Sequence, residues 1–247
     1  MWLNKIIIKN VDDISWTDAT VCPYIVQNKI DIWKINVSAN LVFIDDFLSL
    51  LDAPEITRAN RYVRVADRNR LIISHGALRI ILAKYLNKNP SAIEFVAGIN
   101  KKPYVVNTGK PPLFYNLSHS GDWILLAVSN SECGADIEFI NYDFHYRDIL
   151  PDYFTDDEVQ FIEQDFSTER FFLLWTRKEA FTKATGEGLD SDLKNIPSLD
   201  GVHFSESGQA SSQQDRSISS FKINGGYIGS VVANPVNNEL RFWDINF

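Results

Sequence analysis

Two short acidic motifs carry the residue types best suited to catalysis. Residues 134–138 (Gly-Ala-Asp-Ile-Glu) are typical of a strand, on which Asp136 and Glu138 share one face. Residues 175–183 are typical of a helix, on which Glu179 and Lys183 lie one turn apart. Three carboxylates suit a hard divalent cation such as Mg²⁺, and a lysine beside them suits a phosphate group. The motifs therefore predict metal-assisted phosphoryl chemistry.

Each motif also has a simpler explanation. Any strand with one solvated face can contain Asp-x-Glu, and Glu179 with Lys183 could be a surface ion pair worth about 0.2–0.5 kcal/mol. The functional interpretation rests on a third element just upstream, residues 116–121 (Asn-Leu-Ser-His-Ser-Gly), which we expect to form a loop.

Composition narrows the class of protein. The chain has 247 residues, 45% of them hydrophobic, and its formal net charge of -8 argues against general nucleic-acid binding. No apolar run approaches the roughly 20 residues that span a membrane, and the start of the chain lacks the layout of a signal peptide. Cys22 and Cys133 match no disulfide framework or metal spacing, which favours free thiols. We therefore expect a cytoplasmic protein that binds neither membrane nor nucleic acid.

Charge is distributed unevenly along the chain. Residues 58–88 are rich in arginine and lysine and contain one acid, Asp67, whereas residues 132–169 are rich in acids and contain one base, Arg147. The first region is suited to anions and the second to a cation.

The elements that must position these residues follow from periodicity. A helix start is predicted at Asp52, and we expect helices at 67–86, 155–165 and 168–185, the last closed by Gly186. The predicted strands are a short edge strand at 5–9 and strands at 29–37, 93–96, 104–106, 123–129, 133–139, 202–204, 220–224, 226–233 and 240–246. The Ser/Gln-rich stretch 205–219 is predicted to be a hairpin loop.

Both halves of the chain run strand, helix, strands. The sequence therefore predicts an α+β fold of two similar lobes, 1–133 and 134–247, in which residues 1–28 are an extra N-terminal segment.

In order along the chain, the three motifs resemble those of the 4′-phosphopantetheinyl transferases of the surfactin-synthetase-activating (Sfp) type. That family has a Ser-His-Ser-Gly loop, a Gly-x-Asp-x-Glu strand and a Trp-x-x-Lys-Glu-Ala/Ser-x-x-Lys helix, here at 118–121, 134–138 and 175–183. Residues 186–189 (Gly-Glu-Gly-Leu) fit as well. The resemblance runs from about residue 55 to the last strand and leaves out the first 28 residues. Ala135 replaces the usual Val or Ile.

The resemblance implies two lobes related by a pseudo-twofold axis, with coenzyme A in the cleft between them. It also implies that the phosphopantetheine arm moves from coenzyme A to a serine of an apo acyl or peptidyl carrier protein, releasing 3′,5′-ADP. Asp136, Glu138 and Glu179 would face Mg²⁺, or Mn²⁺ in its place. A monomer is expected, because the two lobes already form the cleft.

Glu158 has two interpretations that do not exclude each other. Residues 155–158 (Thr-Asp-Asp-Glu) fit a capping box, in which Glu158 binds the backbone of the helix start. The family, however, has a candidate general base at this glutamate, which would take the proton of the attacking serine. Lys183 would then stabilise the leaving group near the bridging oxygen or β-phosphate.

The remaining candidates concern coenzyme A. The family uses the loop that contains Ser118, His119 and Ser120 for the 3′-phosphate. Arg58 matches a basic phosphate-binding position, and Lys102-Pro103 resembles a Gly-Lys-Pro segment near the adenine, with Lys101 in place of the glycine. Arg61 and Arg70 are either phosphate neighbours or solubilising helix residues, with Asp67 as an ion-pair partner.

Two rival functions stay open. The same three acids could serve another metal-dependent phosphotransferase or pyrophosphohydrolase acting on coenzyme A. Alternatively, the chain could be a carrier-protein-binding module without catalysis. The intact acids and Lys183 argue against the latter, because a buried acidic cluster is costly to retain.

Overall fold

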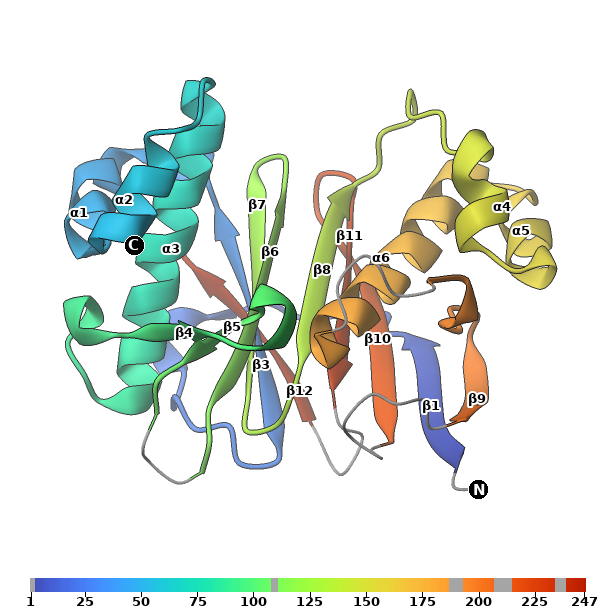
Figure 1. The fold of residues 1–247 in the computed structure, drawn as a ribbon, viewed down its shortest axis with the longest axis horizontal. Coiled ribbons are helices and arrows are strands. Elements are labelled where there is room, and N and C mark those ends of the chain that lie inside the picture. The colour runs from blue at the N-terminus through green and yellow to red at the C-terminus, as the bar shows by residue number, and fades with distance from the viewer. Residues whose placement is uncertain (1–2, 108–110, 187–192, 207–214, 234–238) are drawn as a thin grey trace.

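The computed structural model describes residues 3–107, 111–186, 193–206, 215–233 and 239–247, and it confirms the mixed α+β class (Figure 1). The α-helices are α1 Ile44–Leu50, α2 Ala53–Ala59, α3 Val65–Leu86, α4 Leu150–Tyr153, α5 Asp156–Ile162 and α6 Ser167–Thr185. The strands are β1 Leu3–Asn10, β2 Thr17–Asp18, β3 Lys29–Asn36, β4 Phe95–Ala97, β5 Pro103–Val105, β6 Phe114–Ser120, β7 Trp123–Ser129, β8 Gly134–Phe139, β9 Gly201–Glu206, β10 Arg216–Ile223, β11 Tyr227–Ala233 and β12 Glu239–Ile245.

The two lobes repeat one unit: a strand, a long helix, then two strands. In one lobe the strands pair in the order β3-β7-β6, and in the other in the order β8-β11-β10. Within each unit the first strand pairs with the last, and both pairings are antiparallel. The long helices of the two units are α3 and α6. This repetition confirms the two similar lobes that the sequence predicts.

Each end of the chain joins the sheet of the opposite lobe. Strand β12 pairs in parallel with β3, whereas β1 pairs in parallel with β10 and antiparallel with β9. A boundary after residue 133 therefore separates the two repeated units. It does not separate the two sheets, because each sheet contains a strand from the other half of the chain. The expectation of an edge strand at 5–9 is wrong, because β1 lies between β10 and β9. Its partner in β10 is about 200 residues away, so no local pattern reveals the pairing.

The Ser/Gln-rich stretch does not join a hairpin as predicted. The strands on either side of it, β9 and β10, both pair with β1 and not with each other. Residues 207–214 lie outside the described part of the chain.

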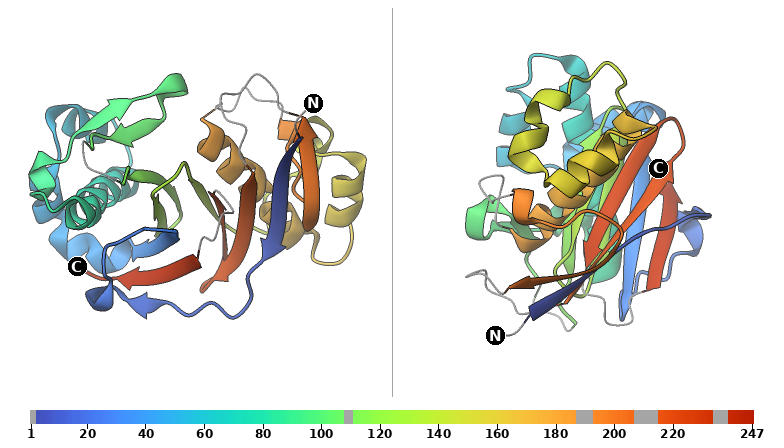
Figure 2. Two further views of the ribbon diagram at one scale, coloured as in Figure 1. Left: turned by 90° about the horizontal axis from the view of Figure 1, so that it is seen from below. Right: turned by 90° about the vertical axis from the view of Figure 1, so that its right-hand side faces the viewer.

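The inner faces of the two sheets pack on each other through apolar side chains of β3, β7, β8, β10, β11 and β12. The first sheet has the strand order β2-β12-β3-β7-β6, and α3 covers its other face. The second sheet has the order β8-β11-β10-β1-β9, and α6 covers its other face (Figures 1 and 2). Strands β6 and β8 are the edges at which the two sheets meet. No helix in the described ranges is long and apolar enough to cross a membrane.

Local signals set the helix ends. Helix α2 starts with a capping box between Asp52 and Glu55, and α5 with one between Thr155 and Glu158. Helix α3 ends where Asn87 takes the left-handed conformation, and α6 ends at Gly186, also left-handed, as the sequence predicts.

Candidate active site

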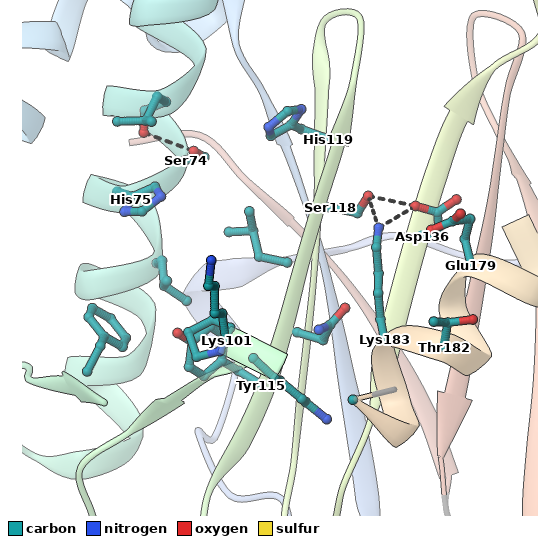
Figure 3. A pocket seen from close by; sticks show the side chains of 18 of the residues that line it. Ser74, His75, Lys101, Tyr115, Ser118, His119, Asp136, Glu179, Thr182 and Lys183 are labelled. Carbon is teal, nitrogen blue, oxygen red and sulfur yellow. Dashed lines mark hydrogen bonds and ion pairs between the residues drawn. The ribbon is translucent and has the colours of Figure 1, made fainter. Parts of the chain in front are cut away.

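A cavity of about 1100 Å³ lies between α3 and α6, above the line where β6 meets β8 (Figure 3). Side chains from both lobes line it. They include Arg58, Leu71, His75, Phe95, Lys101, Lys102, Pro103, Tyr115, Ser118, His119, Asp136, Glu138, Trp175, Glu179 and Lys183. The structure therefore brings together residues from all three sequence motifs.

The Ser-His-Ser segment is a strand and not the predicted loop. Alternate residues of β6 point at β8: Asn116 Oδ1 accepts from the Ala135 N–H at 2.8 Å, and Ser118 Oγ donates to Asp136 at 2.8 Å. Ser120 Oγ likewise donates to Glu138 at 2.8 Å. This period of two is the signal of a strand, and it places His119 on the opposite face.

Asp136 is the centre of the site. It is only 3% exposed, and its Oδ1 accepts from Lys183 Nζ at 2.6 Å and from Ser118 Oγ at 2.8 Å. Its Oδ2 is buried and has no hydrogen-bond partner among the described residues. A buried carboxylate oxygen without a partner is costly, which indicates that another group normally binds there.

Glu138 and Glu179 complete an acidic cluster with Asp136. Burial and the charge of Asp136 raise the pKa of Glu138 to about 7. The same two causes raise the pKa of Glu179. Figure 3 shows the Glu179 and Asp136 side chains next to each other on the α6 side of the cavity. The charge of Lys183 lowers both pKa values, but it does not offset burial and the charge of Asp136.

The donor set fits a hard cation such as Mg²⁺, since all three groups offer carboxylate oxygens and one oxygen is unsatisfied. Within the described residues, however, no three His, Cys, Asp or Glu side chains stand close enough together to count as a preformed metal site. Lys183 occupies Asp136 Oδ1, and the three carboxylates repel one another. A cation that binds here would therefore have to draw the carboxylates together.

The cationic wall, defined here as the lining residues Arg58 and His119 together with the nearby Arg70, which does not itself line the cavity, lies on the other side. Burial lowers the pKa of His119, and the charge of Arg70 lowers it further. Arg70 pairs with Asp67 at 3.2 Å, and its Nε is buried without a partner among the described residues. Arg58 lines the cavity. Arg70 is thus an ion-pair partner of Asp67, and its role as a phosphate neighbour stays a prediction.

Two of the predicted coenzyme A residues have different surroundings from those expected. Arg61 is exposed and is not among the residues that line the cavity. Lys102 and Pro103 line it, but Lys102 Nζ binds Glu132 at 2.6 Å and the Ala184 carbonyl at 2.9 Å. Lys102 thus ties the end of α6 to the loop between β7 and β8, whereas the neighbouring Lys101 is exposed in the cavity lining.

Glu158 is buried outside the cavity lining. Its Oε2 accepts from the Thr155 N–H and pairs with Lys178 Nζ, both at 2.9 Å. Its Oε1 accepts from the Ser198 N–H at 3.0 Å and from Ser198 Oγ at 2.5 Å. Both oxygens are therefore engaged, which favours the helix cap. The role of general base remains an untested prediction.

Two features of the site escaped the sequence analysis. His75 lines the cavity from α3, and its Nδ1 lies 2.7 Å from Glu55. Arg79, one turn later on the same helix face, also binds Glu55, so the spacing of His75 and Arg79 could have suggested a shared partner. Gly134 lets α6 approach β8, since a Cβ there would lie 2.0 Å from the Ala180 carbonyl oxygen. A glycine at the start of a buried strand is the usual signal of such an approach.

Comparison with known proteins places the chain. Residues 39–131 match the family model described as 4′-phosphopantetheinyl transferase, N-terminal, and residues 132–232 match that of the 4′-phosphopantetheinyl transferase superfamily. A 4′-phosphopantetheinyl transferase of Bacillus subtilis is 30% identical over 155 residues, 62% of this chain and 67% of that protein. The chain belongs to the 4′-phosphopantetheinyl transferase superfamily.

Further relatives agree. The slr0495 protein of Synechocystis sp., named as a transferase of this kind, is 34% identical over 157 residues, which cover 62% of this chain and 64% of that protein. Sfp of Bacillus subtilis strain 168 is 25% identical over 195 residues, which cover 76% of this chain and 84% of Sfp. The chain thus matches somewhat under two thirds of the length of slr0495. In this superfamily member, β1 lies outside both matched regions.

Proposed function

We propose that this protein transfers the 4′-phosphopantetheine group of coenzyme A to a serine of an apo acyl or peptidyl carrier protein. The serine oxygen forms a bond to the β-phosphorus of coenzyme A, and the bond from that phosphorus to the bridging oxygen breaks. The serine loses its proton, and 3′,5′-ADP leaves. Many relatives are named as transferases of this kind, which supports the reaction class.

One observation carries the proposal. A single cavity joins a cationic wall on one lobe to an acidic cluster with a lysine on the other, and Asp136 Oδ2 is buried there without a partner among the described residues. A bisphosphorylated nucleotide needs cations at one end, and a pyrophosphate needs a metal and a lysine at the other. Coenzyme A carries both features in one molecule.

The residues divide the work accordingly. His119, Arg58 and Arg70 bind the 3′-phosphate, and Asp136, Glu138 and Glu179 hold Mg²⁺, or Mn²⁺ in its place. When bound, the metal neutralises the pyrophosphate and polarises the phosphorus under attack. Lys183 Nζ, fixed by Asp136 and Ser118 at 2.6 and 2.9 Å, donates to the oxygen on which charge develops as 3′,5′-ADP leaves.

The serine proton needs an acceptor within reach. Glu158 lies outside the cavity lining and both of its oxygens are bonded. A carboxylate oxygen of Glu138 or Glu179 that does not hold the metal, or a water beside it, is therefore better placed to take the proton. The cytoplasm and the monomeric state expected from the sequence remain predictions.

Intact-mass spectrometry of an apo acyl carrier protein, incubated with this protein, coenzyme A and Mg²⁺, tests the proposal. We expect a gain of roughly 340 Da that a chelator abolishes. Release of 3′,5′-ADP without any change in carrier mass would favour the hydrolase. Tight carrier binding without any reaction would favour the binding module.

A further inference from the structure

The half of α6 that carries Glu179 and Lys183 packs on the second sheet through Ala180, Ala184 and the partly buried Phe181. Ala180 and Ala184 pack on Ile6 and Ile8 of β1 and on neighbouring strands. Small side chains let the helix come close to the sheet, as the contact at Gly134 also shows.

Arg177, two residues before Glu179, is 1% exposed and reaches from α6 into the second sheet. Its Nε donates to Ser220 Oγ at 2.9 Å, and its Nη1 donates to the Ser198 carbonyl at 2.6 Å. Its Nη2 donates to Asn10 Oδ1 at 3.0 Å and to Asp200 Oδ1 at 2.6 Å. The guanidinium therefore joins the helix to β1, to β10 and to the segment before β9.

A chain of buried hydroxyls continues from Arg177 toward Asp136. Ser220 Oγ lies 2.9 Å from Ser230 Oγ, which lies 2.8 Å from Thr176 Oγ1 on α6. Ser230 is also the residue that faces Asp136 in the pairing of β11 with β8. The polar layer under α6 thus reaches the strand that supplies the central carboxylate.

One end of this layer comes from the N-terminal segment. Asn10 ends β1, and its Nδ2 donates to Asp200 Oδ2 at 3.0 Å, so it binds both Arg177 and the aspartate that pairs with Arg177. The two matched family regions begin at residue 39. The contribution of β1 is therefore a feature of this chain that the family match does not cover.

We propose that Arg177 is a positioning residue, which fixes α6 on the second sheet so that Glu179 and Lys183 meet Asp136, and that Asn10 of β1 is part of its anchor. The inference rests on the proposed function of that cluster. A buried guanidinium must keep its partners, and a shift of the helix would stretch the hydrogen bonds of Arg177 to Asn10, Ser198, Asp200 and Ser220. A displacement of about 1 Å at a reacting group can cost about a hundredfold in rate.

Two substitutions test this role. Arg177→Lys keeps the positive charge but loses the planar fork, and Asn10→Ala removes one acceptor. Lys9→Ala, an exposed neighbour on the same strand, is the matched control. Mn²⁺ binding by calorimetry, kcat, the KM for coenzyme A and the melting temperature are measured for each, with activity and binding at 20 °C.

We expect Arg177→Lys to weaken Mn²⁺ binding and to lower kcat, each by about tenfold. Asn10→Ala should give a smaller loss in the same direction, and Lys9→Ala none. The KM for coenzyme A should stay within about twofold of wild type, because His119 and Arg58 lie on the other lobe. If Arg177→Lys does not fold, Asn10→Ala decides.

A lower melting temperature with wild-type Mn²⁺ binding and kcat would overturn the proposal, because Arg177 would then serve stability alone. A wild-type protein that binds no Mn²⁺, with or without coenzyme A, would overturn it as well. Mn²⁺ binding needs no carrier protein, so failure of phosphopantetheine transfer is distinguishable from failure of this inference.

Discussion

The two walls of the cavity shift the pKa of a buried carboxylate in opposite directions. On the α3 side, burial alone would raise the pKa of Glu55, but hydrogen bonds from His75, the Asp52 backbone and Arg79 lower it to about 2. On the α6 side, burial and Asp136 raise the pKa of Glu138 to about 7. Glu55 contacts His75 and Arg79 directly, whereas Glu138 accepts a hydrogen bond from Ser120 and the charge of Lys183 offsets its burial only in part. The difference supports the proposal that Glu138 belongs to a cation site, whereas Glu55 belongs to the scaffold.

The largest effect should come from Asp136→Asn, which removes the oxygen left without a partner. We expect phosphopantetheine transfer to fall by roughly a thousandfold, since metal polarisation contributes several kcal/mol. Stability should change little, because Lys183, which pairs with Asp136 and has a side chain that is 30% exposed, can turn to solvent. Initial rates from intact carrier mass, with exposed Asp45→Asn as the control, check this. A variant that keeps a tenth of wild-type activity would contradict the contrast between the two walls, because Asp136 would then not be needed to hold the metal.

Lys183→Met should lower kcat by about a hundredfold, the scale reported for removing one donor to a developing negative charge. The KM for coenzyme A should change less, because the cationic wall stays intact. Lys84→Met, on the exposed face of α3, is the matched control. An increase in KM with unchanged kcat would instead assign Lys183 to ground-state binding.

His119→Ala tests the opposite wall. We expect the KM for coenzyme A to rise by about tenfold, the lower end for a hydrogen bond to a charged group, with kcat nearly unchanged. Dephospho-coenzyme A, which lacks the 3′-phosphate, should be used equally well by the variant and the wild type. An equal loss with both substrates would mean that His119 does not bind that phosphate.

The pH dependence of Mg²⁺ activation tests the acidic cluster. The metal-free pKa of Glu138 is raised to about 7, so a proton competes with the cation below that pH. We expect the Mg²⁺ concentration for half-maximal rate to increase by up to about tenfold between pH 7 and pH 6. Glu138→Gln should flatten this dependence. A wild-type curve that is flat over this range would contradict the assignment.

Glu158→Gln should have the smallest effect on activity. Like Glu55, Glu158 has a positively charged partner, because Lys178 Nζ pairs with its carboxylate at 2.9 Å. We expect kcat within about threefold of wild type in the folded protein, and a loss of about 3 kcal/mol in the free energy of unfolding from breaking a buried pair. Chemical denaturation and steady-state kinetics measure the two. A large loss of kcat with unchanged stability would restore the general-base interpretation.

Local patterns predicted the repeated units well. The alternation in β3 and β7, the apolar spacing of α3 and the glycine that ends α6 are signals within a few residues of one another. The family resemblance named Asp136, Glu179 and Lys183, which the structure places at one end of the cavity.

What sequence patterns missed depends on distant contacts. The pairing of β1 with β10 and of β12 with β3 joins opposite ends of the chain, and parallel partners leave no turn between them to read. The surroundings of Lys102 and Glu158 likewise depend on Glu132, Ala184 and Ser198, which no spacing rule connects to them.

The most direct test of the two-wall account is a crystal structure with coenzyme A and Mg²⁺ bound. The account predicts the ion on Asp136 and its neighbouring glutamates, and the 3′-phosphate beside His119 and Arg58. An ion beside Glu55, or a 3′-phosphate beside Lys183, would contradict it.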